Sequence, residues 1–336
     1  MTLRRCKILL LLALALSQSA CYYMQAARGQ YDVLSRSEPI DELLDAESTP
    51  DELARRLELV QQARQFAVDE LYLPDNDSYR SYADLERDYV VWNVFAAPEF
   101  SLEPKTWCFP VAGCVAYRGY FDEADARRKA AQLGDDGFDV AIGGVPAYST
   151  LGRFDDPVLN TMMRWRDTDL VATIFHELAH QVLYIKDDTA FNESFATAVA
   201  DIGLERWLLS KGETDQFAAY LERRRLREQL VAVIRQARAD LGTLYASGAD
   251  AATMRREKEQ RLQQLTHDLN AKLSESGQDA PGWLGGRLNN ARLVSISLYE
   301  LDLARFRELY EDCERDLRCF YDRASSLRLS ASSNPR

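Results

Sequence analysis

The segment Thr173–His180 contains the pattern His-Glu-x-x-His, which constrains this chain more than any other feature. It lies in a run of regularly spaced apolar residues, a pattern that predicts an α-helix. Because residues four apart lie on one helix face, His176 and His180 can reach a common metal ion while Glu177 projects beside it. This arrangement indicates a catalytic zinc site in which the carboxylate acts as the base.

A catalytic zinc ion needs a third protein ligand and a position open to water. The next helical segment, residues 190–201, follows a polar turn and carries Glu193 in its first turn. A short connection would fold this segment back antiparallel and bring Glu193 level with His180. Thr197 and Asp201, one and two turns further on, are candidates to orient the ligands from behind. We therefore expect one zinc ion per chain.

The scarcity of histidine supports this interpretation over that of a helix with merely solvated polar residues. The chain has three histidines, and two of them fall at the ligand spacing. The third, His267, has polar neighbours, and we expect it to be a solvated helix residue.

The amino terminus predicts export. Three basic residues precede the apolar segment Ile8–Leu16, whose nine residues are too few to span a bilayer but typical of a signal peptide, here residues 1–20. The tripeptide Ser19-Ala20-Cys21 resembles a bacterial lipobox, although Gln18 departs from the usual leucine. We expect lipid on Cys21 and a periplasmic protein anchored to the outer membrane. The alternative is ordinary cleavage, which leaves a soluble periplasmic protein with a free thiol.

Of the six cysteines, Cys6 would leave with the signal peptide and Cys21 is assigned to the lipid. The other four form two close pairs, Cys108 with Cys114 and Cys313 with Cys319, each with five intervening residues. Three connectivities are possible, and two local disulfides in an oxidising compartment are the simplest. A metal site is the alternative, but the spacing lacks the Cys-x-x-Cys form of structural zinc sites.

Composition limits the class of protein. The 336 residues are 46% hydrophobic, which is enough for one large or two modest globular domains. A net charge of −12 argues against nucleic acid or a bare anionic membrane as a partner, because both would repel the chain. The sequence leaves the oligomeric state undetermined.

The pattern along the chain predicts a predominantly helical α+β fold with a small mixed sheet. We expect a tether and lead-in at 21–50, a catalytic core at 51–210, a helical hairpin at 211–276, and helices at 277–336 that complete the catalytic domain. The run Arg223–Arg225 in the hairpin is typical of a solvated face, and the hairpin could serve as an arm for partner docking or for gating access.

A predicted strand at residues 138–142 leads into Gly143, Gly144 and Pro146. Glycine permits close approach of another backbone, and proline is confined to sheet edges. We interpret this segment as an edge strand that faces the active site and binds extended substrate antiparallel. A hairpin turn at the two glycines is the other possibility.

Together these segments resemble one family, the bacterial predicted aminopeptidases, which are exported lipoproteins of the gluzincin type of zinc metallopeptidase. The resemblance rests on the two zinc segments and three others, which are Cys108–Phe121, Gly143–Gly152 and Asn289–Arg292. It departs from better-known gluzincins in the short separation of His180 from Glu193 and in Thr197, where an acidic residue is usual. The resemblance implies a zincin-like fold and removal of amino-terminal residues from peptides.

In such an enzyme Glu177 would take a proton from the attacking water and deliver it to the leaving amine. The developing oxyanion needs a further donor, for which Tyr299 and Tyr148 are the candidates. Asn290 and Arg292 are candidates to contact substrate. Two other functions stay open at this point: a structural lipoprotein that acts through its helical hairpin, and a zinc hydrolase of non-peptide substrates.

Overall fold

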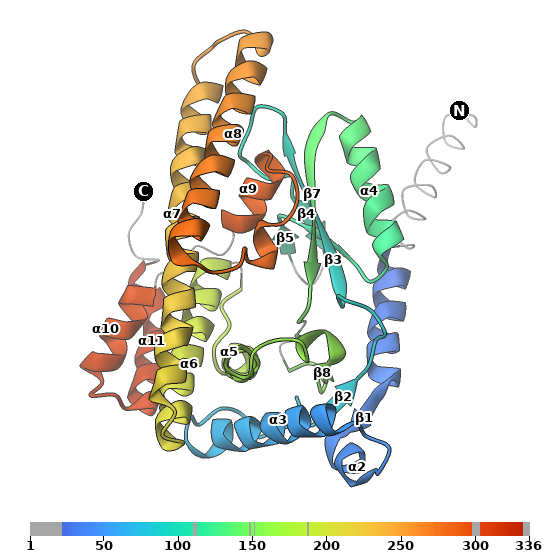
Figure 1. Ribbon diagram of the computed structural model, residues 1–336, viewed down its shortest axis with the longest axis vertical. Coiled ribbons are helices and arrows are strands. Elements are labelled where there is room, and N and C mark those ends of the chain that lie inside the picture. Colours follow the sequence, from blue (N-terminus) through green and yellow to red (C-terminus); the bar gives the residue numbers. More distant parts are fainter. Residues whose placement is uncertain are drawn as a thin grey trace, which may run out of the picture.

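The fold is described from a computed structural model, which covers residues 22–109, 113–147, 149–150, 152–186, 188–297 and 303–331. Helix makes up 62% of the structure, and the strands form small sheets, so the predicted α+β class is confirmed. Figure 1 shows long helices and small sheets arranged around the central helix α5 (Asp167–Val182). Among the described residues, no helix has the length and apolarity that crossing a membrane requires.

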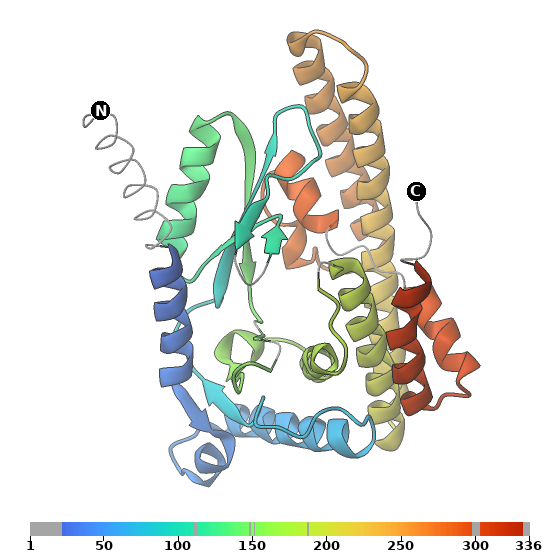
Figure 2. The same cartoon turned by 180° about the vertical axis from the view of Figure 1, so that it is seen from behind.

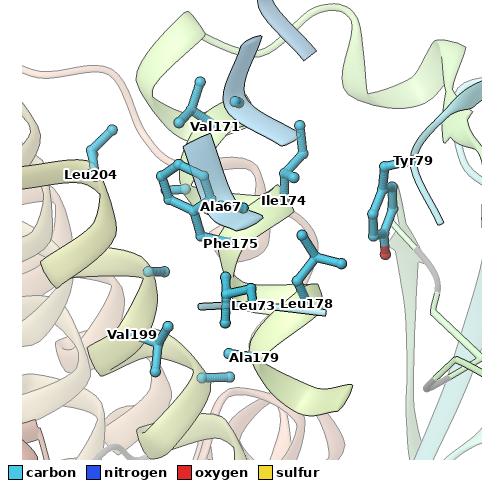
Figure 3. Packing of buried hydrophobic residues seen from close by; sticks show 14 of the residues in the cluster. Ala67, Leu73, Tyr79, Val171, Ile174, Phe175, Leu178, Ala179, Val199 and Leu204 are labelled. Atoms are coloured by element: carbon cyan, nitrogen blue, oxygen red, sulfur yellow. The ribbon is translucent and has the colours of Figure 1, made fainter. Parts of the chain in front are cut away.

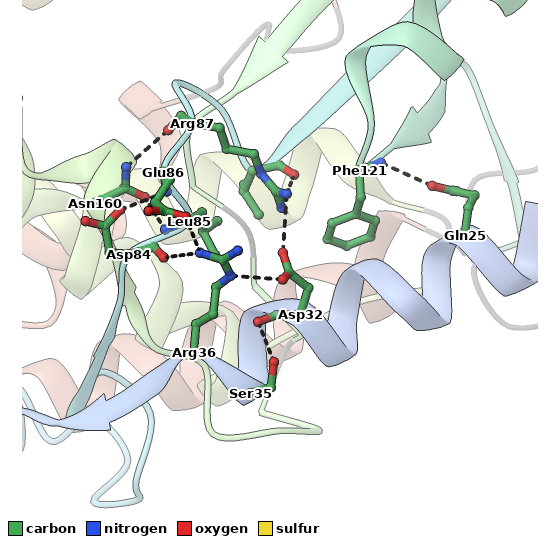
Figure 4. Close-up of polar contacts among 11 residues, drawn as sticks. Gln25, Asp32, Ser35, Arg36, Asp84, Leu85, Glu86, Arg87, Phe121 and Asn160 are labelled. Carbon is green, nitrogen blue, oxygen red and sulfur yellow. Dashed lines mark hydrogen bonds and ion pairs between the residues drawn. The ribbon is translucent and has the colours of Figure 1, made fainter.

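The segment predicted to be a tether is folded instead. Residues 22–35 are helical, and β1 (Ser37–Pro39) and α2 (Ile40–Asp45) follow. Val33 is buried in the main core, and the Gln25 side chain receives a hydrogen bond from the Phe121 backbone. Figure 4 shows this helix against the body of the protein, with Arg36 bonded to Glu86. Apolar residues at helical spacing therefore outweighed the polar composition of this segment.

The remaining helices include three that start at a capping side chain and one that ends at a left-handed glycine. An aspartate side chain accepts a backbone hydrogen bond at the start of α4, α6 and α8, and Gly277 ends α8 in the left-handed conformation with a φ of 65°. These helices are α3 (Asp51–Asp69), α4 (Glu123–Asp135), α6 (Thr189–Ser210), α7 (Thr214–Tyr245), α8 (Ala251–Ser276), α9 (Asn290–Ser297), α10 (Leu303–Asp312) and α11 (Leu317–Ala331), with short 3-10 turns at Asn160–Met162 and Gly282–Leu284.

Three small sheets are present in the described residues, whereas one mixed sheet was expected. The mixed sheet has the order β1-β2-β8, with β2 (Ser81–Ala83) and β8 (Val158–Leu159). The antiparallel sheet has the order β6-β3-β7, with β6 (Arg118–Tyr120), β3 (Val91–Pro98) and β7 (Phe138–Val145). The third sheet is the pair of β4 (Trp107–Phe109) and β5 (Gly113–Val115). Helices α4 and α9 lie on either side of the β6-β3-β7 sheet (Figure 1).

Strand β7 is an edge strand and passes straight through both glycines, so the hairpin alternative was wrong. Gly144 is required by close packing, because a Cβ atom there would lie 2.4 Å from the ring of Tyr89. The predicted edge strand therefore exists, and it ends four residues before Ser149.

The main core surrounds the apolar side of α5. Its side chains Ile174, Phe175 and Leu178 are fully buried, and they pack against residues of α3 and α6 (Figure 3). At Gly203 of α6, a Cβ atom would lie 2.8 Å from the Phe175 ring, so glycine allows the two helices to approach closely. One side of α5 is thereby fixed in the core, and its polar side is left for the site.

Helices α7 and α8 form the predicted long hairpin, which projects beyond the rest of the molecule in Figures 1 and 2. The arginine run at its base is not the solvated face that the composition predicted. Arg223 forms an ion pair with Asp169 of α5, and Arg224 is paired with Asp201 of α6, while Arg225 remains 66% exposed. The hairpin is thus joined to α5 and α6 by ion pairs. His267, on α8, is exposed as predicted.

Both predicted disulfides are formed, Cys108 with Cys114 and Cys313 with Cys319. The first closes the β4–β5 hairpin, and the second joins the end of α10 to the start of α11. Cys21 lies outside the described residues, so its lipidation stays a prediction.

Candidate metal site

Helix α5 presents His176, Glu177 and His180 on its polar side, and the connection after it places Glu193. The Asn192 side chain bonds both the backbone N–H and the carbonyl of Ile185, at 2.7 Å each, which holds the start of α6 against the end of α5. The helices cross steeply, since Figures 1 and 2 look along α5 while α6 runs across the view. The expected antiparallel return was therefore wrong, although the crossing still brings Glu193 to the histidines.

His176, His180 and Glu193, which we call the donor cluster, point ligand atoms at one another. The two Nε2 atoms are 3.1 Å apart, and the Glu193 carboxylate oxygens lie 3.4 Å from Nε2 of His176 and 3.7 Å from Nε2 of His180. Ligands at about 2.0–2.1 Å from one tetrahedral ion lie roughly 3.3 Å from one another. The spacing and the two-nitrogen, one-oxygen chemistry of the donor cluster therefore fit a zinc ion.

Thr197 and Asp201, which were expected to orient the ligands from behind, differ in their contacts with the histidines. Nδ1 of His176 lies 3.4 Å from the Thr197 hydroxyl, which can fix the ring with Nε2 directed at the other donors. Asp201 contacts neither imidazole: it accepts a hydrogen bond from Tyr220 at 3.0 Å and pairs with Arg224. Its charge contributes to raising the pKa of His176, so its role behind the ligands stays a prediction, while α7 supplies partners that the local sequence did not reveal. Nδ1 of His180 is buried without a hydrogen-bond partner in the described part of the chain.

Burial and charge act on the titratable groups of the site in opposite directions. Burial lowers the pKa of His180 to about 4, which favours the neutral, ligating form of its ring. Burial also lowers the pKa of His176, but Glu193 and Glu177 outweigh it and the net shift is upward. The pKa of Glu193 is lowered: burial would raise it, but the hydrogen bond and charge of His176 prevail. Burial raises the pKa of Glu177.

The surroundings of Glu177 include three residues that the sequence did not single out, namely Tyr79, Ser149 and Asp156. The Ser149 hydroxyl interacts with Glu177 and lies 3.3 Å from Asp156, whose carboxylate also accepts hydrogen bonds from the Thr150 backbone and hydroxyl. The charge of Glu177 contributes to raising the pKa of Tyr79, after the larger effect of burial. The loop that follows β7 is thus fastened to the proposed base.

Tyr79 has two properties that no local pattern could reveal. Its backbone adopts a left-handed conformation with a φ of 63°, which is unfavourable for a residue with a bulky side chain. Its hydroxyl is buried beside Ser149 and close to the Glu177 carboxylate. A bond from the Tyr79 backbone N–H to the Asp156 carbonyl, at 2.7 Å, holds this conformation. Tyr148 and Tyr299, the predicted oxyanion donors, lie outside the described residues.

Two other tyrosines line the approach to the donor cluster. The Tyr184 ring lies 6.3 Å from the His180 ring and is 51% exposed. Tyr117 is close enough to Glu193 and Tyr184 for their charges to add to the effect of burial, which raises its pKa. The Tyr117 ring lies 5.8 Å from Phe95 of β3. These rings connect the donor cluster with the β6-β3-β7 sheet.

The predicted substrate-binding residues separate into two groups. Asn290 is fully buried. Its side chain accepts a hydrogen bond from the Tyr245 hydroxyl at 2.8 Å and donates to the carbonyls of Pro98 and Glu99. It is therefore a structural residue, and the prediction that it contacts substrate was wrong. Gly143 and Arg292, in contrast, lie together: a Cβ atom at Gly143 would be 4.0 Å from the Arg292 guanidinium.

Comparison with known proteins assigns the family. The chain matches the model of a family described as "Putative aminopeptidase" over residues 21–335, so it belongs to this family. No curated protein and no solved structure gives a significant match. The aminopeptidase resemblance is therefore confirmed for nearly the whole chain.

Proposed function

We propose that this member of the aminopeptidase family is a zinc-dependent peptidase of the gluzincin type, with a zincin-like catalytic core, that removes amino-terminal residues from peptides. The observation that carries the proposal is the donor cluster, whose three ligand atoms lie within 4.8 Å of one another beside the buried carboxylate of Glu177. A scaffold protein would have no need of a general base at this place.

A zinc ion bound there would supply Lewis acidity, which lowers the pKa of water and polarises a peptide carbonyl. Glu177 accepts the proton of the attacking water and transfers it to the departing amine. Ser149 steadies the Glu177 carboxylate from the loop after β7. Within the described residues, the buried hydroxyl of Tyr79 is a further donor close to this base.

The compartment is also part of the proposal. A signal peptide at residues 1–20 and lipid on Cys21 would place the enzyme in the bacterial periplasm, anchored to the outer membrane. The two disulfides support an oxidising compartment, where such bonds persist.

The structural alternative, in which the hairpin is the working part, has less support. Lys258 of α8 forms an ion pair with Asp139 of β7 at 2.6 Å, and Arg223 of α7 is paired with Asp169 of α5. These contacts, made by partly buried side chains, bind both arms of the hairpin to the elements of the site. A hairpin held in this way is better suited to support the site than to act as a separate docking arm.

A peptide-library digest read by mass spectrometry tests the proposal. The zinc-loaded protein should remove single amino-terminal residues, a chelator should stop the reaction, and added zinc should restore it. Peptides with an acetylated amino terminus should be spared, because an aminopeptidase recognises the free amine. Internal cuts would make the protein an endopeptidase. An absence of cuts from zinc-loaded protein would favour the non-peptide or structural alternatives.

A further inference from the structure

Side chains bind only some of the backbone groups along the outer edge of β7, the edge away from β3. Val145 directs its carbonyl inward, where it accepts a hydrogen bond from Val90. Directions alternate along an antiparallel strand, so the residues that face outward are Val140, Ile142 and Gly144. The first two have their carbonyls occupied, by the Asn289 side chain and by Arg292, each at 2.9 Å. The exposed Gly144 is then the next outward position, and there the edge is free of these side chains.

Arg292 stands where the closed part of this edge meets the open part. Its guanidinium lies between Gly143 and Gly286, where Cβ atoms would be 4.0 and 2.9 Å away. A side chain at Gly286 would crowd the guanidinium, whereas a Cβ atom at Gly143 would only touch it, so Gly286 is the glycine that provides its space.

The Arg292 guanidinium is left with unused hydrogen-bonding capacity. Within the described residues the guanidinium makes one hydrogen bond, to the Ile142 carbonyl, its Nε is buried without a partner, and no carboxylate forms an ion pair with it. Burial lowers its pKa without an opposing acid. A guanidinium offers five N–H donors in a planar fork that matches a carboxylate.

A second buried arginine, Arg64, allows the hydrogen bonds of the Arg292 guanidinium to be compared with those of a structural guanidinium. Arg64 also lacks a carboxylate partner, but it bonds the carbonyls of Pro74, Asn76 and Ser78 at 2.6 to 3.1 Å. Three carbonyls therefore bind two of its three nitrogens, and only Nη1 is buried without a partner. Among the described residues Arg292 has one such carbonyl, so its charge and its Nη donors are less fully used than those of Arg64.

The direction of β7 decides which end of a peptide meets Arg292. The strand runs from Phe138 to Val145 and continues to Ser149, which contacts Glu177. A peptide added antiparallel therefore has its amino end towards Glu177 and its carboxyl end towards Ile142. A parallel peptide would bring its ammonium group to Arg292, where like charges repel.

We propose that Arg292 binds the free carboxylate of a short peptide that lies antiparallel on the open edge of β7. This inference rests on the proposed function, and it names the substrate class: oligopeptides of a few residues with an unmodified carboxyl terminus. A strand advances about 3.3 Å per residue, so one peptide length places the carboxylate at Arg292 while the amino-terminal bond lies at the donor cluster.

Equilibrium binding tests this inference without relying on turnover. Trialanine and its carboxyl-terminal amide would be titrated calorimetrically into zinc-loaded full-length protein that carries Glu177→Gln. The free acid should bind on the order of 10- to 100-fold more tightly, the value of hydrogen bonds to a charged group. Adding Arg292→Gln should abolish this preference, and Arg292→Lys should keep part of it, because the charge remains while the fork is lost.

Arg287→Gln is the matched control. Arg287 precedes Arg292 by five residues, and its side chain is 85% exposed, so the variant removes one positive charge without touching the proposed carboxylate site. It should leave the preference for the acid intact. A series from the dipeptide to the hexapeptide should show the preference greatest at one length. An amide of Ala-Ala-Asp that binds as tightly as trialanine would overturn the assignment to the terminal carboxylate.

The outcomes separate this inference from the proposed function. Equal affinity for acid and amide, no binding of either, or a preference that survives Arg292→Gln would overturn it. If the wild type trims peptides while acid and amide bind equally, the aminopeptidase proposal stands without it. If Arg292-dependent binding occurs without any cleavage, the inference stands and the peptidase proposal fails.

Discussion

Helix α6 carries two carboxylates, Glu193 and Asp201, that meet opposite surroundings. Asp201 is 8% exposed and fully engaged, because it bonds the Tyr220 hydroxyl and pairs with Arg224, both from α7. Glu193 is 25% exposed, and its polar contacts among the described residues are the two imidazoles of the donor cluster. The comparison teaches that a carboxylate balanced by arginine joins helices, whereas a carboxylate that points with two imidazoles at a common place is arranged as the proposed zinc site needs it.

The largest effect should follow from Glu193→Ala. The variant lacks one of three zinc ligands, so metal analysis after dialysis should find most of the zinc lost and peptidase activity gone. Glu205→Ala, on the same helix and half-buried, is the control and should keep its zinc. One zinc ion per chain in the Glu193 variant would show that the donor cluster has been misinterpreted.

Glu177→Gln should lower turnover by about 10²–10⁴-fold, because glutamine retains size and hydrogen bonding but cannot accept a proton. Zinc content and the unfolding transition should be unchanged. Loss of zinc from this variant would instead make Glu177 a ligand, and full activity would place the base elsewhere.

Asp201→Ala should destabilise the protein by up to about 3–5 kcal/mol, since it leaves the largely buried Arg224 with the longer, exposed ion pair to Glu228 at 3.7 Å. Chemical denaturation measures the loss, and zinc per folded chain should stay the same. A double variant, Asp201→Leu with Arg224→Met, should recover much of the stability because it removes both charges. A zinc loss at full stability would contradict the contrast between the two carboxylates.

Thr197→Val should have the smallest effect, a weakening of zinc affinity by about 10- to 100-fold, because it removes the hydroxyl behind Nδ1 of His176. Competition with a chelator of known affinity measures it. Thr243→Val, on the exposed surface of α7, serves as the control and should bind zinc like the wild type. Equal affinities in both variants would assign Thr197 to packing alone.

Features set by short-range periodicity were predictable. The spacing of His176 and His180, the first-turn position of Glu193, the two disulfides and the long hairpin are each contained in a few neighbouring residues. Helical geometry converts such spacing directly into a shared face. For this reason the donor cluster could be named before any fold was known.

Features that depend on distant partners were not predictable. Asn290 and Arg292 are two residues apart in one polar segment, yet Asn290 is held by Tyr245 and two carbonyls of the chain near β3. The Arg292 side chain makes one hydrogen bond in the part of the chain that the structure describes. The same holds for Arg224. The local sequence predicted that it is solvated, but in the fold it pairs with Asp201 of α6. No pattern within the local segment distinguishes these outcomes.

The sequence by itself therefore determined the family and which residues form the donor cluster, and it named the ligands and the base that we propose, because these depend on residue identity and on spacing within a helical turn. Only the tertiary structure decided that α5 and α6 cross steeply, that Tyr79 and Ser149 lie beside Glu177, and that Arg292 remains available at the open edge of β7. The physical reason is that a buried polar group takes its role from the partners that the fold brings to it, and those partners lie far away in the sequence.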